Sequence, residues 1–496
     1  MTDAIVLVQM PFIPSARTDR ITSHMRWCHR ATLDRIETTW QFDETLRDEK
    51  LGTTTAVEEE LKFELNSLRK SNRDYWSFRG NAARHHGHAY FQYPAMMVPR
   101  MQGDLIRAAK KADPRIRRVF DPFVGSGTAL TETMMNGMDF FGFDVNPLAI
   151  LLCRAKTIPF FCESLERRFA EVMDRVRTDG GCRLETTFKG WNKWFRRDAA
   201  IALSRIRRSI ASDDSRWARQ FFWVALAETV RMSSNSRTST FKLHIRPEDE
   251  RLTRDISPIA TFESIATRNL EHLRSAKDVL AERKLISQGR YVGDVSVDLC
   301  DASKSKRARS ENLCDLLITS PPYGDNATTI PYGQHSFLPL QWIELGDIDC
   351  GVDDSYLRST HEIDSRSLGG SRAVSERDRS ELRAMSRNFA ECLRELRSEP
   401  SDREKRVTAF SRDLNRCIEP VLSHLRKGAF MIWIVGNRRV AGRPFPLDRI
   451  LSDLLVSRGA KRISRIKRVI PSKRMAVRND IAETMGRETI LVLRKG

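Results

Sequence analysis

The sequence predicts a doubly wound α/β fold with a large helical insertion. Largely apolar runs at residues 118–120, 140–143 and 315–318 are each followed by glycine, proline or acidic residues, as in buried strands that end in loops. A fourth run, 429–435, has no polar alternation, which indicates a strand buried on both faces. Between residues 160 and 287, apolar residues recur at helical spacing over a length too great for an ordinary crossover.

The first strand leads into a glycine-rich turn. The segment Asp121-Pro-Phe-Val-Gly-Ser-Gly-Thr128 follows it and precedes a helical pattern. Gly125 and Gly127 lack side chains, so the backbone can approach a ligand there. The turn lacks the full G-x-G-x-x-G of a dinucleotide site, and the chain contains no G-x-x-x-x-G-K-[ST]. A nucleoside without a pyrophosphate therefore fits best.

Acidic residues are expected at the ends of the next two strands. Asp144 ends the second strand, where a nucleoside-binding sheet places a carboxylate on ribose hydroxyls. Asp294 is expected to cap a third strand and to accept from an adenine amine, with a solvated turn aspartate as the alternative.

The second motif, Thr319-Ser-Pro-Pro-Tyr323, follows the run 315–318. Pro321 and Pro322 lack an amide proton and cannot continue a central strand, so this segment must be a loop at the carboxyl end of the sheet. The Ser320 oxygen and the Pro321 carbonyl can accept from an exocyclic amine. Tyr323 can stack on a base.

Together the two motifs resemble the S-adenosylmethionine-dependent amino methyltransferases of DNA, which carry D-P-F-x-G-S-G-T and [DNS]-P-P-[YFW]. Ser320-Pro-Pro-Tyr323 most resembles the cytosine-N4 branch of restriction-modification type. The resemblance covers roughly residues 91–156 and 291–495. It implies a Rossmann-like methyltransferase sheet, S-adenosylmethionine as cofactor, and direct transfer of a methyl group to the N4 amine of a flipped cytosine in duplex DNA. Methylation at carbon 5 would need a cysteine nucleophile, and the chain has no Pro-Cys pair.

The motifs and the resemblance define the expected site. The expected catalytic residues are Ser320, Pro321, Pro322 and Tyr323. The expected cofactor-binding residues are Tyr93, Pro94, Asp121, Pro122, Phe123, Gly125, Ser126, Gly127, Thr128, Asp144, Asn146 and Asp294. No metal is expected, and His85, His86 and His88 are interpreted as a polar loop.

Three alternatives stay open. Adenine-N6 methylation uses the same geometry, and the cofactor motif precedes the catalytic motif here, whereas many cytosine-N4 enzymes have the reverse order. An RNA guanine-N2 methyltransferase shares the sheet and a similar loop. A non-catalytic DNA-binding protein that retains the fold is the alternative from a different class.

Charge supports a nucleic-acid partner. The 496 residues include 84 Lys and Arg against 65 Asp and Glu, a net charge of +19 with a pI near 9.8. Such a balance favours a polyanion, although an arginine-rich composition also accompanies GC-rich genomes. Nine cysteines without a C-x-x-C pair indicate reduced thiols. With no apolar run long enough for a membrane span, the expected location is the bacterial or archaeal cytoplasm, at the nucleoid.

The chain is divided into four expected regions. Residues 1–75 form an accessory N-terminal segment with a helix at 54–70, residues 76–160 and 288–496 the catalytic domain, 161–287 the helical insertion, and 346–405 a charged insertion that is either a mobile loop or a target-recognition region. Double-stranded DNA is the expected partner, with a cognate restriction endonuclease acting on the same site. Expected DNA contacts are Arg231, Ser234, Asn235, Arg237 and Lys242 in the helical insertion, and Lys473 and Arg474 between the last two strands.

Overall fold

The computed structural model describes residues 54–70, 72, 74–78, 84–325, 329–397, 401–470 and 486–496. Residues 1–53 of the expected accessory segment lie outside these ranges. The expected DNA contacts Lys473 and Arg474 also lie outside the described residues.

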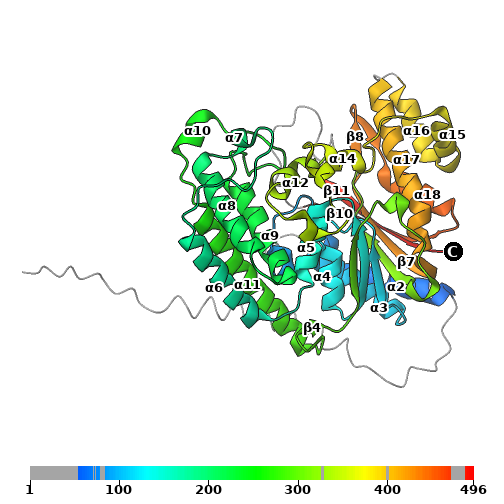
Figure 1. The fold of residues 1–496 in the computed structure, drawn as a ribbon. Helices are drawn as coiled ribbons and strands as arrows, with labels where there is room; N and C mark the ends of the chain where they lie inside the picture. Colours follow the sequence, from blue (N-terminus) through cyan, green and yellow to red (C-terminus); the bar gives the residue numbers. More distant parts are fainter. Residues whose placement is uncertain are drawn as a thin grey trace, which may run out of the picture. The chain divides into compact units, whose positions relative to one another are not determined.

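A seven-stranded sheet forms the centre of the described chain (Figure 1), with the order β10-β11-β7-β6-β1-β2-β5. Neighbouring strands from β7 to β5 are parallel, whereas β11 is antiparallel to both β7 and β10. This mostly parallel, doubly wound sheet confirms the predicted Rossmann-like fold class. The strands are β1 (Arg118–Asp121), β2 (Asp139–Asp144), β5 (Val295–Leu299), β6 (Cys314–Thr319), β7 (Leu425–Val435), β10 (Lys461–Val469) and β11 (Arg487–Arg494).

The order of the sheet reverses at β1. After β1 the chain adds β2 and β5 on one side, and then returns to the other side of β1 to form β6 and β7. Open α/β sheets bind ligands outside the carboxyl ends of the strands at such a switch point. The glycine turn follows β1 and the Ser-Pro-Pro-Tyr loop follows β6, so both motifs lie at this position.

Helices cover both faces of the sheet. In β7, Phe430, Ile432 and Ile434 belong to one hydrophobic core, while Met431 and Trp433 belong to the other, as the two-residue period of a strand requires. The predicted doubly buried strand is thus confirmed. The first core includes residues of α3 (Pro99–Ala112), α4 (Thr128–Met135), α5 (Pro147–Lys156) and α12 (Tyr332–Leu340), and the second includes residues of α17 (Ser401–Ser423) and α18 (Leu447–Val456).

The segment after α5 is helical, as predicted. Phe169 and Phe222 on two of its helices contact one another, with ring centroids 6.1 Å apart. Their core is continuous with the first core of the sheet, and α9 packs against α5 and α12, so the insertion joins the sheet through the helices that cover it (Figure 1). Its helices are α6 (Cys162–Thr178), α7 (Trp191–Trp194), α8 (Arg197–Ala211), α9 (Arg216–Ser233), α10 (Glu248–Thr253) and α11 (Pro258–Glu282).

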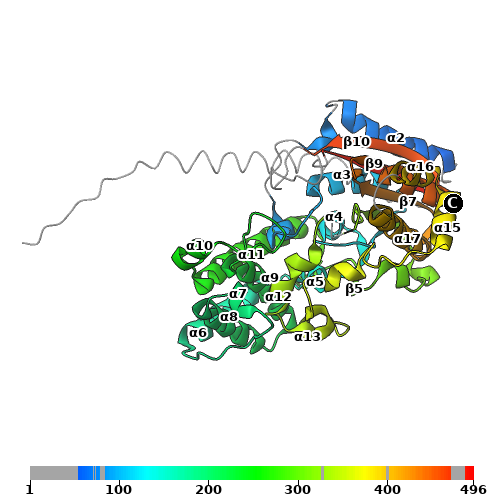
Figure 2. The same cartoon turned by 90° about the horizontal axis from the view of Figure 1, so that it is seen from above.

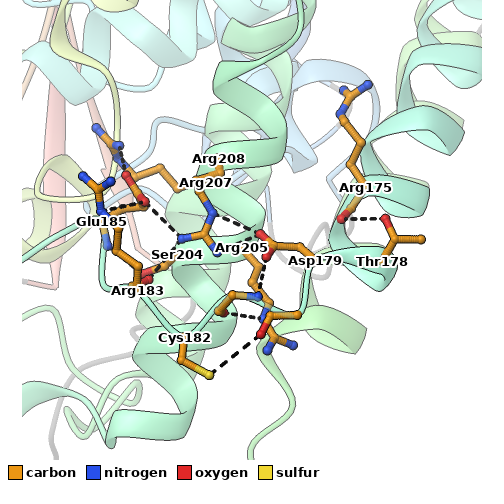
Figure 3. Close-up of polar contacts among 12 residues, drawn as sticks. Arg175, Thr178, Asp179, Cys182, Arg183, Glu185, Ser204, Arg205, Arg207 and Arg208 are labelled. Carbon is orange, nitrogen blue, oxygen red and sulfur yellow. Dashed lines mark hydrogen bonds and ion pairs between the residues drawn. The ribbon is translucent and has the colours of Figure 1, made fainter.

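Many arginines of this insertion pair within it. Arg208 on α8 donates to Asp179 at 2.7 Å and to Glu185 at 3.0 Å, which holds the loop after α6 against α8 (Figure 3). Arg207 lies 3.8 Å from Glu185 as well. Arg183 also lies 3.7 Å from Glu185, although 84% of its side chain is exposed. Part of the positive charge is therefore neutralised inside the fold.

The described residues of the charged segment, 346–397 and 401–405, are largely helical. It forms α14 (Glu362–Arg366), α15 (Glu376–Met385) and α16 (Arg387–Leu396). Leu382 and Phe389 are buried in the second core with α17 and α18. Of the two alternatives predicted for this segment, a mobile loop does not fit, because few but regularly placed apolar residues suffice to dock these helices. The target-recognition region stays a prediction.

The helix predicted at 54–70 is present as α2 (Thr54–Lys70) and packs beside β10 (Figure 2). Leu61 and Leu65 are buried in the first core, and the buried Glu58 pairs with Lys461. Glu58 also lies 3.6 Å from Arg494. This part of the expected accessory segment is therefore integral to the sheet domain.

The strands β10 and β11 pair antiparallel at one edge of the sheet. Two shorter hairpins join β3 (Ile286–Ser287) to β4 (Arg290–Tyr291) and β8 (Arg438–Val440) to β9 (Arg443–Phe445). In the described part of the chain, no helix has the length and apolar character needed to cross a membrane.

Candidate active site at the carboxyl ends of β1 and β6

A cavity lies at the switch point of the sheet. Its empty volume, which includes open solvent at the mouth, is about 810 Å³. Eleven expected residues line it: Tyr93, Pro94, Pro122, Phe123, Gly125, Ser126, Thr128, Asp144, Asn146, Ser320 and Pro322. The structure thus brings most of the two sequence motifs to one cavity.

The glycine turn shapes one wall of this cavity. Gly125 and Gly127 have φ angles of +48° and +70°, a region that disfavours residues with a side chain. A Cβ atom on Gly127 would lie 2.8 Å from the Cys153 sulfur. Gly127 therefore shapes the turn by close packing behind it, while Ser126 and Thr128 face the cavity at the start of α4.

Asp144 is the last residue of β2, directly before the loop that follows this strand. Its two oxygens accept from the backbone N–H groups of Gly125 and Asn146, each at 2.9 Å. Burial raises the pKa of its carboxyl, and the two backbone donors oppose that rise. The Asn146 amide donates to the Tyr93 hydroxyl at 2.9 Å, which fixes the segment before α3 against this loop. Tyr93, Asp144 and Asn146 form one connected wall.

Asp121 does not line the cavity. Its Oδ1 accepts from the Thr319 hydroxyl at 2.5 Å and from the Phe123 N–H at 3.0 Å, so it joins the end of β1 to the end of β6. Burial raises the pKa of Asp121 from 3.8 to about 7. The structure places this expected cofactor ligand between the two motif loops, where it holds them together.

Asp294 lies at the wrong end of its strand for a cofactor contact. It precedes β5, is 88% exposed and sits 3.8 Å from Arg118. Since β5 is parallel to β2, Asp294 is at the edge opposite the cavity. Asp301, just beyond the carboxyl end of β5, lines the cavity instead and accepts from the Ser303 N–H at 2.9 Å.

The remaining wall comes from residues that sequence reasoning missed. Arg366 is held by Glu362 at 2.9 Å, with its guanidinium 3.9 Å from the centre of the Tyr356 ring. The polar composition of the 346–405 segment gave no signal that it reaches the cavity. The further lining residues are Ala95, Met97, Val124, Val145, Cys300, Ala302, Tyr332, Ile363, Ser367, Leu368 and Cys417.

The Ser-Pro-Pro-Tyr loop forms the opposite side. Ser320 and Pro322 line the cavity, whereas the buried Pro321 and the partly buried Tyr323 are not among its lining residues. The Ser320 hydroxyl is 3.0 Å from the Tyr323 hydroxyl, which in turn donates to Glu488 on β11 at 3.0 Å. Burial raises the pKa of Tyr323 well above its usual value, and the negative charge of Glu488 is the second largest cause of this rise. Glu488 was not expected, because its contact joins segments far apart in sequence.

Three of the expected DNA contacts are buried. Arg231 pairs with Glu228 at 3.0 Å, and the buried Asn235 amide donates to the Lys193 carbonyl at 3.0 Å. Ser234 is buried beside them. These residues stabilise the end of α9 and cannot reach a phosphate, so this part of the prediction was wrong.

The exposed members of the set are Arg237 and Lys242. Arg237 lies 3.4 Å from Glu250, an exposed pair of the kind that contributes little to stability. Both cations can therefore turn toward a polyanion.

Of the three histidines expected in a polar loop, His85 is exposed, whereas His86 is partly buried and His88 is buried. His88 is buried, with its Nε2 atom 2.9 Å from Glu132, and burial lowers its pKa. His86 lies 3.3 Å from the Ser275 hydroxyl. Among the described residues, no group of three or more histidine, cysteine or acidic side chains is arranged to hold a metal.

Comparison with known proteins gives one extensive similarity. The chain is 28% identical over 428 residues to the Type II methyltransferase M.MvaI of Kocuria varians, covering 84% of this chain and 92% of that protein. No protein-family profile matches the chain. Among solved structures, the rRNA methyltransferase aviRa from Streptomyces viridochromogenes aligns at 10% identity with a TM-score of 0.27, covering 84% of this chain and 96% of that one. The similarity to the Kocuria protein, over most of both chains, supports a methyltransferase.

Proposed function

We propose that this chain is an S-adenosylmethionine-dependent DNA methyltransferase that modifies the N4 amine of cytosine in duplex DNA. The observation that carries the proposal is that Ser320 and Pro322 line the same cavity as Gly125 and Asp144. A methyl acceptor held by the first pair would be close to a nucleoside held by the second. The similarity to a Type II methyltransferase supports the reaction type.

The residues of the cavity fit the proposed cofactor. The carboxylates of Asp144 and Asp301 can accept from ribose hydroxyls and from an adenine amine. Phe123, Ile363 and Leu368 offer apolar surface for the adenine ring. When bound, S-adenosylmethionine supplies the methyl group.

The catalytic loop would orient the amine that receives the methyl group. The Ser320 oxygen and the Pro321 carbonyl accept its two hydrogens, which directs the nitrogen lone pair toward the cofactor side of the cavity. Tyr323 supports the plane of the base by stacking. Because this amine is paired within a duplex, the base must leave the helix, at a cost of a few kcal/mol.

Nucleoside mass spectrometry tests the proposal. Plasmid DNA from cells that express the wild-type chain is compared with DNA from cells that express Ser320→Ala. N4-methylcytosine that is present with the wild type and lost with the variant supports the proposal, whereas N6-methyladenine would keep the reaction and change the base.

Two further outcomes contradict the DNA assignment. If neither modified base appears, while the purified protein binds S-adenosylmethionine, RNA replaces DNA as the substrate. If the protein does not bind this cofactor, the enzyme assignment fails and a DNA-binding role replaces it. The same proposal places the protein in the cytoplasm, with a restriction endonuclease of the same recognition site as partner; resistance of the plasmid to that nuclease is the corresponding readout.

A further inference from the structure

A series of hydrogen bonds connects Ser320, which lines the cavity, to Arg468 on the edge strand β10. Ser320 Oγ lies 3.0 Å from the Tyr323 hydroxyl, and Tyr323 donates to Glu488 Oε1 at 3.0 Å. The other oxygen of Glu488 accepts from Arg468 Nη1 at 2.5 Å. These four groups come from the loop after β6, from β11 and from β10.

The direction of each hydrogen bond in this series follows from Arg468, the group at its end. Arg468 has only 4% of its side chain exposed and is a donor without an acceptor. The Glu488 carboxylate beside it can only accept, so Tyr323 must donate its single proton to Glu488. Burial keeps the pKa of Tyr323 high, which retains that proton. The Tyr323 oxygen is then left to accept from the Ser320 hydroxyl.

We propose that Glu488 is a positioning residue that acts through Tyr323 to fix Ser320 Oγ as a hydrogen-bond acceptor. With its own proton directed at Tyr323, Ser320 turns lone pairs alone toward the cavity that it lines. This inference rests on the proposed function, in which Ser320 accepts a hydrogen from the amine to be methylated.

The fixed direction matters because a serine hydroxyl can also donate. A hydroxyl that donated to the amine would engage the nitrogen lone pair, which must instead attack the methyl group. Aspartate at this position of the related motif can only accept. The hydrogen bonds through Tyr323 to Glu488 likewise leave Ser320 Oγ able only to accept a hydrogen bond from the amine.

Glu488→Gln tests the direction of the chain with little change of shape. Arg468 still requires an acceptor, so the amide oxygen turns to Arg468 and the amide N–H turns to Tyr323. Tyr323 then donates to Ser320, whose proton is released toward the amine. We expect kcat to fall by about tenfold, the effect of about one hydrogen bond, while KM for DNA and the affinity for S-adenosylmethionine stay within about twofold.

A double-mutant cycle separates this role from a structural one. Tyr323→Phe keeps the ring but removes the hydroxyl, and we expect a lower kcat with unchanged KM. In the Tyr323→Phe background, Glu488→Gln then has no further effect on kcat, because the hydrogen bonds between Glu488 and Ser320 are already interrupted. Independent, multiplicative effects of the two changes, or a Tyr323→Phe variant with the kcat of the wild type, would overturn the inference.

Asp453→Asn provides a matched control. Asp453 has 16% of its side chain exposed, against 15% for Glu488, and it pairs at 3.0 Å with Arg462, which is also on β10. We expect this change to lower the melting temperature and to leave kcat unchanged. If kcat falls equally in Asp453→Asn and Glu488→Gln, the effect is general destabilisation and the inference is wrong.

The wild-type assay distinguishes the two levels of the proposal. A wild-type protein that methylates DNA, with a Glu488→Gln variant that is equally fast, refutes only the role of Glu488. A wild-type protein that transfers no methyl group to DNA refutes the proposed function and the inference with it.

Discussion

At the scale of single residues, Asp121 joins the two motif loops through one oxygen. Oδ1 accepts from Thr319 and Phe123, whereas Oδ2 is buried and has no hydrogen-bond partner among the described residues. Leaving a carboxylate oxygen buried in this way disfavours ionisation. The pKa of about 7 follows from this environment, and the group titrates within the fold near neutral pH.

We expect the free energy of unfolding of the wild-type chain to fall, relative to Asp121→Asn, as the pH rises from 3.8 to about 7. The native pKa lies above the unfolded value, so the native state holds an extra proton between these two pH values and loses that advantage as the pH rises. Urea unfolding at pH 5 and pH 8, followed by tryptophan fluorescence, measures the difference. A constant difference between the two proteins would mean that Asp121 stays ionised throughout.

Gly127→Ala is expected to weaken binding of S-adenosylmethionine at least tenfold. The new Cβ would lie 2.8 Å from the Cys153 sulfur and would hold a φ of +70°, so the turn beside the cavity must shift. Isothermal titration calorimetry measures the affinity. Gly442→Ala is the control, since Gly442 has a φ of +72°, would carry a Cβ with no atom within 4 Å of it, and does not line the cavity. Equal losses of affinity in both variants would contradict this explanation.

At the scale of the element, the ends of strands decided what the sequence could predict. Pro321 and Pro322 cannot continue a strand, so local chemistry alone placed Ser320 at a carboxyl end. For β5 the sequence alone was ambiguous, because Asp294 precedes the strand and Asp301 follows it. Which of them faces the cavity depends on parallel pairing with β2, a contact distant in sequence.

Asp301→Ala is therefore expected to weaken S-adenosylmethionine binding about tenfold, and Asp294→Ala to leave it unchanged. Asp301 lines the cavity and offers an acceptor that is lost in the variant, an effect of about one hydrogen bond. Equilibrium binding of the cofactor to the two variants checks the contrast. A loss with Asp294→Ala alone would restore the sequence-based assignment.

The end of α9 shows a second limit of sequence reasoning. Arg231 and Asn235 have the composition of a nucleic-acid contact, and Glu228 lies one helical turn before Arg231. Their burial arises from the packing of α9 against α5, α11 and α12, which join it from distant parts of the chain. The helix itself was predictable from its apolar spacing, but its fully buried environment was not.

At the scale of the whole molecule, the net charge of +19 includes both basic residues paired with acids inside the fold and basic residues exposed at the surface. Arg208 and Arg231 are paired with acids inside the fold, whereas Arg237 and Lys242 are exposed. Only exposed cations can neutralise phosphates and release counterions. The electrostatic part of the proposed DNA binding would therefore depend on a subset of the basic residues.

Arg237→Ala and Lys242→Ala are each expected to reduce the slope of log K against log salt concentration by about 0.9, the value for one phosphate contact. Fluorescence anisotropy of a labelled duplex at several salt concentrations measures this slope. Arg231→Ala, which removes a buried cation, should lower the melting temperature and keep the slope. An unchanged slope in both surface variants would place the DNA elsewhere on the molecule.

The place of β11 in the sheet has a consequence for the synthesis of the protein. This strand, Arg487–Arg494, is synthesised after both β7 and β10, yet it lies between them in the sheet. The sheet cannot close until those residues leave the exit tunnel. Glu488 lies on this strand, so under its proposed role a product that stops before Arg487 would lack the group that orients Ser320.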